Sequence, residues 1–259
     1  MRVALISLNQ SWEDKKKNLI KCEKYILKAK IKNANLIIFP ELTLTGFSFN
    51  IDAISEHRDS SETIRCFKKL AKNNKINIIF GVCIHTKEGA NNKSILINSL
   101  GKVVIDYSKI HLFSFANEDK YFVPGKKISF GNFNKKTSIG ITICYDLRFP
   151  ELYHLLSNNC EVVINIANWP LERIDHWRTL LKARAIENQL FIVGVNRTGI
   201  DLNKLSYPSS SMIFGPTGNK CKPVYKTKTI GIYDIDVSEV VMSRESFPKI
   251  HDRRNFLEI

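Results

Sequence analysis

The chain lacks the sequence features of several protein classes. Its six cysteines form no CxxC pair, and no group of cysteine and histidine has the spacing of a zinc finger, so we expect free thiols and no structural metal site. No apolar run approaches the ~18 residues of a membrane-spanning helix, and no charged stretch leads into an apolar segment near the first residue. We therefore expect a soluble, cytoplasmic protein without a membrane partner.

A further absence bears on the net charge of +14, which by itself suggests an anionic partner such as nucleic acid. No cluster of Lys and Arg is interleaved with aromatic residues, and no helix-turn-helix pattern occurs. Segment 15–32 contains eight lysines, yet Leu19, Cys22, Ile26 and Ala29 follow one another at spacings of three and four, which is typical of a helix on a core. We therefore predict a solvated, lysine-rich surface that attracts acidic small molecules, and no nucleic-acid partner.

Two halves of the chain repeat the same order of predicted elements. In the first half we predict a strand, a helix with Ser11 as its N-cap, a strand, a helix, a strand and a hairpin, at 2–8, 12–32, 35–39, 61–73, 76–85 and 93–99 with 103–107. In the second half the corresponding segments are 138–144, 150–158, 161–167, 173–189 and 190–196, followed by 210–214 and 229–236, which we expect to pair around a turn at 215–218.

The predicted strands are continuously apolar, which indicates burial on both faces. We therefore predict one α/β domain over residues 1–259, a four-layer αββα sandwich of two mixed sheets with internal pseudo-symmetry. The polar, basic tail 243–259 is expected to extend along the surface or along a neighbour.

One cysteine, Cys144, stands where a strand of β-branched residues stops, at the kind of sheet edge that holds the chemistry of open α/β proteins. A thiol needs a base or a cationic neighbour to become a nucleophile at neutral pH. Glu41 and Lys109 each close another strand, although a strand-capping carboxylate and a surface lysine are the plain alternatives. We interpret the three residues as one site, in which Glu41 takes the thiol proton and Lys109, with the backbone N–H of Tyr145, stabilises an oxyanion.

Three motifs together resemble the nitrilase superfamily of carbon–nitrogen hydrolases. They are Phe39-Pro-Glu-Leu-Thr-Leu-Thr-Gly-Phe47, Lys109-Ile-His-Leu-Phe113 and Cys144-Tyr-Asp-Leu-Arg-Phe-Pro-Glu-Leu152, in the family's order and with family-like separations. The resemblance implies a carbon–nitrogen hydrolase domain over 1–259 with a Glu-Lys-Cys triad. It also implies hydrolysis of a small carboxamide through a cysteine thioester, without metal or organic cofactor, and a homodimer or larger homo-oligomer.

Many members of this superfamily use a second glutamate shortly after the lysine. Glu118 stands near the expected place, and Asp119 and Glu151 are its rivals.

Within the superfamily, Ala167-Asn-Trp-Pro170, His176-Trp177 and 183–189 are most similar to the omega-amidase branch. That branch hydrolyses the terminal amide of 2-oxo acids such as 2-oxoglutaramate and 2-oxosuccinamate, so the substrate is expected to be a small anionic amide.

The residues expected to bind this substrate are Asn168, Trp169 and Arg197, with Arg173 and Arg197 as candidates for the distal carboxylate. Ser209 replaces a usual glycine in Tyr207-Pro-Ser-Ser-Ser-Met212. This leaves the acyl group open, and deaminated glutathione, N-carbamoyl amides and aliphatic amides are competing substrate classes.

A different mechanism and a different protein class compete with this interpretation. A papain-like Cys/His enzyme would use His111, His154 or His176, although the local signatures of such proteases are absent. A non-catalytic, basic nucleic-acid-binding protein would bind DNA with a steep salt dependence. We also predict that Asp146 and Arg148 form a buried ion pair that shapes the turn after Cys144.

Overall fold

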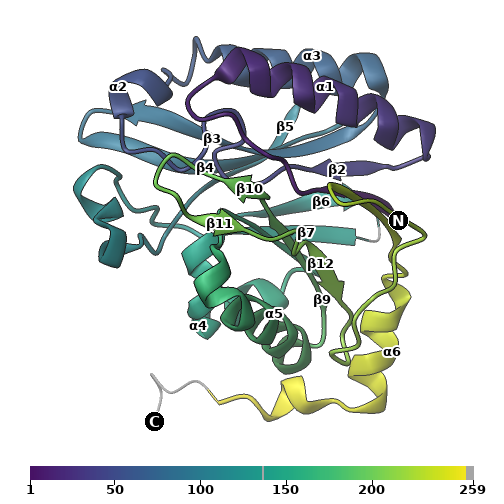
Figure 1. Ribbon diagram of the computed structural model, residues 1–259. Coiled ribbons are helices and arrows are strands. Elements are labelled where there is room, and N and C mark those ends of the chain that lie inside the picture. Colours follow the sequence, from purple (N-terminus) through teal and green to yellow (C-terminus); the bar gives the residue numbers. More distant parts are fainter. Residues whose placement is uncertain (136, 255–259) are drawn as a thin grey trace.

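The computed structural model describes residues 1–135 and 137–254. Two sheets lie face to face, and helices cover the outer side of each (Figure 1). The first sheet has the strand order β13 (Tyr225–Lys226), β14 (Ile230–Asp234), β1 (Arg2–Ile6), β2 (Leu36–Ile38), β3 (Asn77–Thr86), β4 (Gly89–Ile97) and β5 (Val103–Ser108). The second has the order β12 (Met212–Phe214), β9 (Phe191–Asn196), β8 (Val162–Ala167), β7 (Thr137–Ile143) and β6 (Phe130–Asn134).

The remaining elements cover the sheets or connect their strands. Helices α1 (Lys15–Ile31) and α3 (Glu62–Asn74) lie on the first sheet, and α4 (Pro150–Ser157) and α5 (Ile174–Asn188) lie on the second (Figure 1). The other elements are α2 (Ile51–Ile54), α6 (Ser238–Ser246), the hairpin β10 (Gly199–Ile200) with β11 (Ser206–Tyr207), and the 3-10 helices η1 (Ser114–Ala116), η2 (Glu118–Lys120), η3 (Cys144–Arg148), η4 (Leu171–Arg173) and η5 (Lys249–Asp252). None of the helices in the described ranges is both long and apolar enough to cross a bilayer.

The two sheets share a core arrangement of strands. In the first, β1, β2 and β3 are parallel, with β4 antiparallel on β3 and β14 antiparallel on β1. In the second, β7, β8 and β9 are parallel, with β12 antiparallel on β9 and β6 antiparallel on β7. The predicted pair of mixed sheets with internal pseudo-symmetry is confirmed.

Apolar cores separate the layers within the described residues. The central core joins the facing sides of both sheets, with residues such as Ile38 and Ile164. The outer cores join each sheet to its helices, for example through Phe67 on α3 and Trp177 on α5. Because each such side chain contributes roughly 1.5–3 kcal/mol when it leaves water, burial on both faces explains why strands such as β8, Val162–Ala167, are apolar along their whole length.

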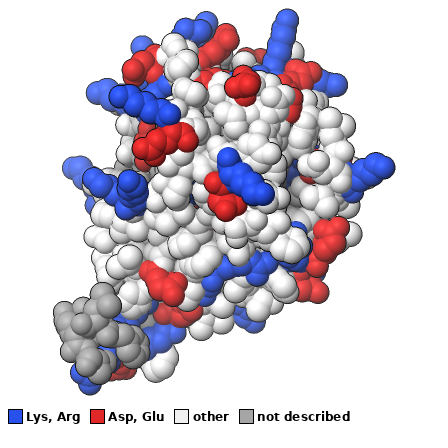
Figure 2. Space-filling model, turned by 90° about the vertical axis from the view of Figure 1, so that its left-hand side faces the viewer, with Lys and Arg blue, Asp and Glu red and all other residues white. Residues whose placement is uncertain are grey.

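Helix α1 carries most of its lysines on the solvent side, as predicted, and buries Asn18, Cys22, Ile26 and Ala29. On the side of the molecule shown in Figure 2, basic and acidic side chains are interspersed. The predicted N-cap at Ser11 is wrong. The Asp14 carboxylate instead accepts a hydrogen bond from the Lys17 amide at 2.9 Å.

The predicted pairing of 210–214 with 229–236 is also wrong. Strand β12 pairs with β9, whereas β14 pairs with β1 in the other sheet. After the turn at 215–218 the chain returns along β12, where the Cys221 amide donates to the Ile213 carbonyl, and then crosses to the first sheet. Both segments are apolar, so their sequence pattern does not specify which strand each one joins. Strands β6, β10, β11 and β13 were not predicted.

The C-terminal segment lies across the ends of α4 and α5. Arg253 donates to the Ser157 hydroxyl at 2.7 Å and to the Asn188 side chain at 2.8 Å. Residues 255–259 of the predicted tail lie outside the described residues.

Candidate active site

Several strands from both sheets end at one cavity of about 330 Å³. Glu41 follows β2, Lys109 follows β5, Cys144 follows β7, and Asn168 and Trp169 follow β8. The aromatic part of the wall consists of Phe47, Phe49, Phe113, Tyr145, Trp169 and Tyr207. The cavity therefore brings residues from both halves of the chain together, as the strand-end positions predicted.

Two side chains of the lining, Glu41 and Lys109, form a fully buried charged cluster with Glu118, which lies behind the lining. The Lys109 ammonium lies 3.1 Å from Glu41 Oε1 and 2.8 Å from Glu118 Oε2. Burial opposes the charge on Lys109, but the carboxylates of Glu118 and Glu41 outweigh it and raise the lysine pKa. Lys109 is therefore a fixed cation at neutral pH, and the cluster carries one negative charge when both carboxylates are ionised.

Glu118 is the acidic residue of its loop that reaches this cluster. The Phe113 amide donates to Glu118 Oε2 at 2.7 Å, which fixes the carboxylate. Burial raises the pKa of Glu118, and Lys109 opposes that rise. The rivals Asp119 and Glu151 are both exposed, whereas Glu118 is buried.

Cys144 sits on a strained turn between β7 and η3. Its φ of +47° lies in the left-handed region, which costs a non-glycine residue roughly 1–2 kcal/mol. The Asp146 carboxylate holds the turn, because it accepts hydrogen bonds from the Ile143 amide at 2.9 Å and the Tyr107 hydroxyl at 2.7 Å. Tyr145 is the next residue, so its amide is among the first N–H groups of η3, which have no partner within that helix.

The Cys144 thiol is a neutral group in the free protein. Burial raises its pKa, and the negative charge of Glu41 adds to this effect. Asn168 connects thiol and carboxylate: its carbonyl lies 4.0 Å from Cys144 Sγ, and its amide donates to Glu41 Oε2 at 2.9 Å. Attack by this sulfur therefore requires a base at the moment of reaction.

Two arginines that line the cavity are far less constrained than Lys109. The predicted ion pair between Asp146 and Arg148 is wrong, because Asp146 is occupied by the turn. The Arg148 guanidinium instead lies 4.9 Å from the centre of the Trp169 ring, and that of Arg173 lies 5.6 Å from the Phe113 ring. Within residues 1–135 and 137–254, neither arginine forms an ion pair with a carboxylate.

Of the other residues expected to bind substrate, Asn168 and Trp169 line the cavity and Arg197 does not. Arg197 is fully buried behind the wall, with its guanidinium 4.6 Å from the Tyr207 ring and 3.4 Å from the Gln10 carbonyl. Its position behind Tyr207 and outside the lining does not support substrate contact. Ser209 is exposed and donates to the Lys228 carbonyl at 2.6 Å, outside the lining.

No histidine belongs to the described lining of the cavity. His111 Nδ1 lies 2.9 Å from Asp146 Oδ1, His176 Nδ1 lies 3.3 Å from Arg148 Nη2, and His154 belongs to α4. The papain-like mechanism is therefore not supported, because it requires a histidine imidazole beside the Cys144 thiol.

Sequence reasoning missed two residues here, Arg148 and Asn92. Arg148 was assigned to the wrong partner. Asn92, buried in β4, donates to both Glu41 and Glu118. The sequence pattern that could have indicated Asn92 is a polar amide side chain in a strand that continues with apolar residues.

This fold and site agree with the comparisons to known proteins. The model of the carbon–nitrogen hydrolase family matches residues 2–245, so the chain belongs to this family. It is an amide-hydrolysing enzyme.

Among its relatives, the 2-oxoglutaramate amidase of Bacillus subtilis is 31% identical, with 98% of each chain covered. Omega-amidase YafV of Yersinia enterocolitica is 30% identical, with 99% of this chain and 98% of the relative covered. A solved structure of XC1258 from Xanthomonas campestris, a superfamily protein with an arsenic adduct in its active site, matches with a TM-score of 0.89 at 28% identity, over 99% of this chain and 98% of that one.

Proposed function

We propose that this enzyme hydrolyses the terminal amide of a small 2-oxo acid, such as 2-oxoglutaramate or 2-oxosuccinamate, to a carboxylate and ammonia. One observation carries the proposal: a single cavity is lined both by Cys144, Glu41 and Lys109 and by two arginines, Arg148 and Arg173, that have no carboxylate partner among the described residues. A small substrate that carries both an amide and a carboxylate matches these two sets of groups. The relatives named as omega-amidases support the same substrate class.

In the proposed reaction, Cys144 Sγ attacks the amide carbon while Glu41 takes the thiol proton. The oxyanion is stabilised by the Lys109 ammonium and the Tyr145 N–H, donors of a kind whose loss typically costs about 3–4 kcal/mol. The protonated Glu41 then gives its proton to the leaving nitrogen, and ammonia departs to leave a thioester on Cys144. Water, activated by Glu41, hydrolyses the thioester and restores the thiol, so the scheme uses no metal or organic cofactor.

Arg148 and Arg173 are proposed to hold the distal carboxylate. A guanidinium donates two parallel hydrogen bonds to a carboxylate, and because it has five N–H donors, Arg148 retains donors for one besides its Nη2 contact of 3.3 Å with His176 Nδ1. The aromatic wall excludes water from the intervening carbons, which strengthens these charged contacts. This assigns to Arg148 the role that the sequence suggested for Arg197.

An ammonia-release assay tests the proposal. The purified protein is offered 2-oxoglutaramate, 2-oxosuccinamate, glutamine, N-carbamoyl acids, deaminated glutathione and small aliphatic amides, with Cys144→Ser as the control. Release from the 2-oxo amides, lost in the control, is expected. If ammonia is released only from another amide, the proposed substrate class changes from 2-oxo amides to that class. Full activity of Cys144→Ser would reject the thioester mechanism.

The homodimer implied by the family resemblance stays a prediction, and light scattering on the purified protein would measure the mass in solution.

A further inference from the structure

The side chain of Asn92 contacts both buried carboxylates. It lies in β4, and its Nδ2 donates to Glu41 Oε1 at 2.8 Å and to Glu118 Oε1 at 3.2 Å. The carbonyl of the same residue accepts the Lys109 amide at 2.9 Å. Asn92 thus touches all three members of the buried charged cluster and is itself almost completely buried.

The orientation of this amide is determined by its neighbours. If it were turned over, its carbonyl oxygen would face two carboxylate oxygens, which accept hydrogen bonds and repel it. In the observed orientation Asn92 Oδ1 has no hydrogen-bond partner among the described residues. A buried acceptor without a partner is costly, so the cluster keeps Asn92 in this orientation at the expense of local stability, a pattern expected of a functional site.

The two carboxylate oxygens of Glu41 have different hydrogen-bond partners. Oε1 accepts hydrogen bonds from Asn92 and from the Lys109 ammonium. Oε2 accepts the Asn168 amide, and the carbonyl of Asn168 is the group that the Cys144 thiol contacts. Oε2 is therefore the oxygen that Asn168 connects to the thiol.

We infer that Asn92 is a positioning residue, whose hydrogen bond to Oε1 supports the negative charge of Glu41 beside Glu118 and leaves Oε2 to Asn168, the residue that contacts the Cys144 thiol. Two carboxylates in one buried site repel each other, so that one of them tends to hold a proton. Lys109 offsets one negative charge, and the Asn92 amide is a neutral donor shared by both carboxylates. The inference rests on the proposed role of Glu41 as the base.

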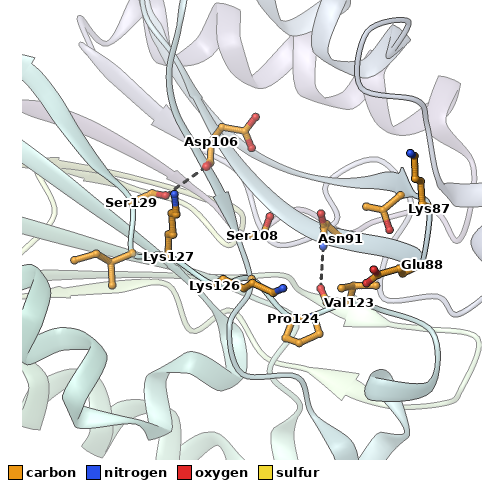
Figure 3. Close-up of a pocket in the computed structure, with 13 residues that line it drawn as sticks. Lys87, Glu88, Asn91, Asp106, Ser108, Val123, Pro124, Lys126, Lys127 and Ser129 are labelled. Carbon is orange, nitrogen blue, oxygen red and sulfur yellow. Dashed lines mark hydrogen bonds between the residues drawn. The ribbon is translucent and has the colours of Figure 1, made fainter.

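The neighbouring residue on the same strand offers a matched control. Side chains alternate along a strand, and Asn91 lines a separate cavity of about 530 Å³ (Figure 3) whose lining contains no member of the charged cluster. There its Nδ2 donates to the Val123 carbonyl at 2.9 Å. Asn91→Leu therefore removes an amide hydrogen bond from β4 without touching Glu41 or Glu118.

The test measures how fast iodoacetamide alkylates Cys144 as a function of pH, followed on the Cys144 peptide by mass spectrometry. The proteins are the wild type, Asn92→Leu, Asn92→Asp and Asn91→Leu, and thermal unfolding checks that each is folded. Asn92→Leu is expected to slow alkylation at pH 7 by about 10- to 100-fold, the range for hydrogen bonds to charged groups. Because an ionised Glu41 then loses a donor, the acidic limb of the profile moves to higher pH.

Asn92→Asp should move that limb further in the same direction, since it adds a third carboxyl group, whereas Asn91→Leu should stay within about twofold of wild type. The inference would be overturned if the acidic limb of the alkylation profile stayed at the wild-type pH in a folded Asn92→Leu protein. It would also be overturned if Asn91→Leu moved that limb by the same amount.

Alkylation needs no amide substrate, so this result is separate from the substrate assignment. A shifted Asn92→Leu profile together with no ammonia release from 2-oxo amides would keep the positioning role and reject the substrate. A Glu41→Gln variant that is alkylated like the wild type would remove the base on which the inference depends.

Discussion

The cavity is lined by positive charges in opposite states. Lys109, the inner cation, is fully buried between two carboxylates, which raise its pKa. Arg148 and Arg173, the outer pair, are partly exposed, lie near aromatic rings and have no carboxylate partner among the described residues. In the proposed function, the inner cation is paired within the protein, whereas the outer pair binds the carboxylate of the substrate.

Removal of the inner cation should have the largest effect. Lys109→Met leaves two carboxylates buried together, and losing one partner of a buried ion pair costs roughly 3–5 kcal/mol. We expect amide hydrolysis to fall by at least about 10²-fold, the cost of one oxyanion donor. Without the cation, burial favours the protonated form of these carboxyl groups in the folded protein. Because they must then ionise as the pH rises, the free energy of unfolding should fall as pH rises through neutrality.

Chemical denaturation at several pH values measures this effect. The control is Lys93→Met, which removes a partly exposed ion pair of 2.8 Å with Asp106 and should cost about 1 kcal/mol or less. Equal losses in the two variants would contradict the special position of Lys109.

Substitution of Arg148 or Arg173 should alter substrate choice and leave the chemistry intact. Arg148→Met and Arg173→Met are each expected to raise KM for a 2-oxo amide by about 10- to 100-fold, because each removes a charged hydrogen bond. Hydrolysis of an uncharged aliphatic amide should change little. Arg178→Met, at an exposed position paired with Asp175 at 3.2 Å, is the control, and an equal loss on both substrates would argue against a carboxylate site.

A smaller effect concerns the resting state of the nucleophile. Burial and Glu41 raise the pKa of Cys144, and a raised thiol pKa means that the proton is retained to higher pH. The difference in absorbance near 240 nm between the wild type and Cys144→Ser should therefore show no thiolate between about pH 7 and the ordinary thiol pKa of about 8.5. A thiolate signal at neutral pH would indicate a preformed ion pair instead.

The smallest effect is expected at Ser209. Since this residue is exposed and outside the cavity lining, Ser209→Gly should leave kcat/KM within about twofold of wild type for every amide tested. A changed order of substrate preference would show that the 207–212 segment acts on the acyl group.

How much of this the sequence predicts depends on how local each feature is. Strand ends and their polar residues are local, so the two-sheet fold and the meeting of Glu41, Lys109 and Cys144 in one place were predictable. The direction of Arg148 was not, because it depends on the left-handed φ at Cys144 and on Asp146 being occupied elsewhere. The partners of β12 and β14 are set by contacts between distant segments, and an apolar strand does not encode its neighbour.

The origin of the site in both halves of the chain has a consequence for folding. Glu41 and Lys109 follow strands of the first sheet, and Cys144 and Asn168 follow strands of the second. The first sheet is complete only when β14 pairs with β1, which brings Asp234 opposite Arg2. Pairing over such a separation is a slow event in folding. In a ribosome-bound or partly folded chain that lacks β14 or the docked second sheet, the Cys144 thiol is therefore not yet held beside Glu41 and Lys109. The appearance of amidase activity would report the docking of the two sheets.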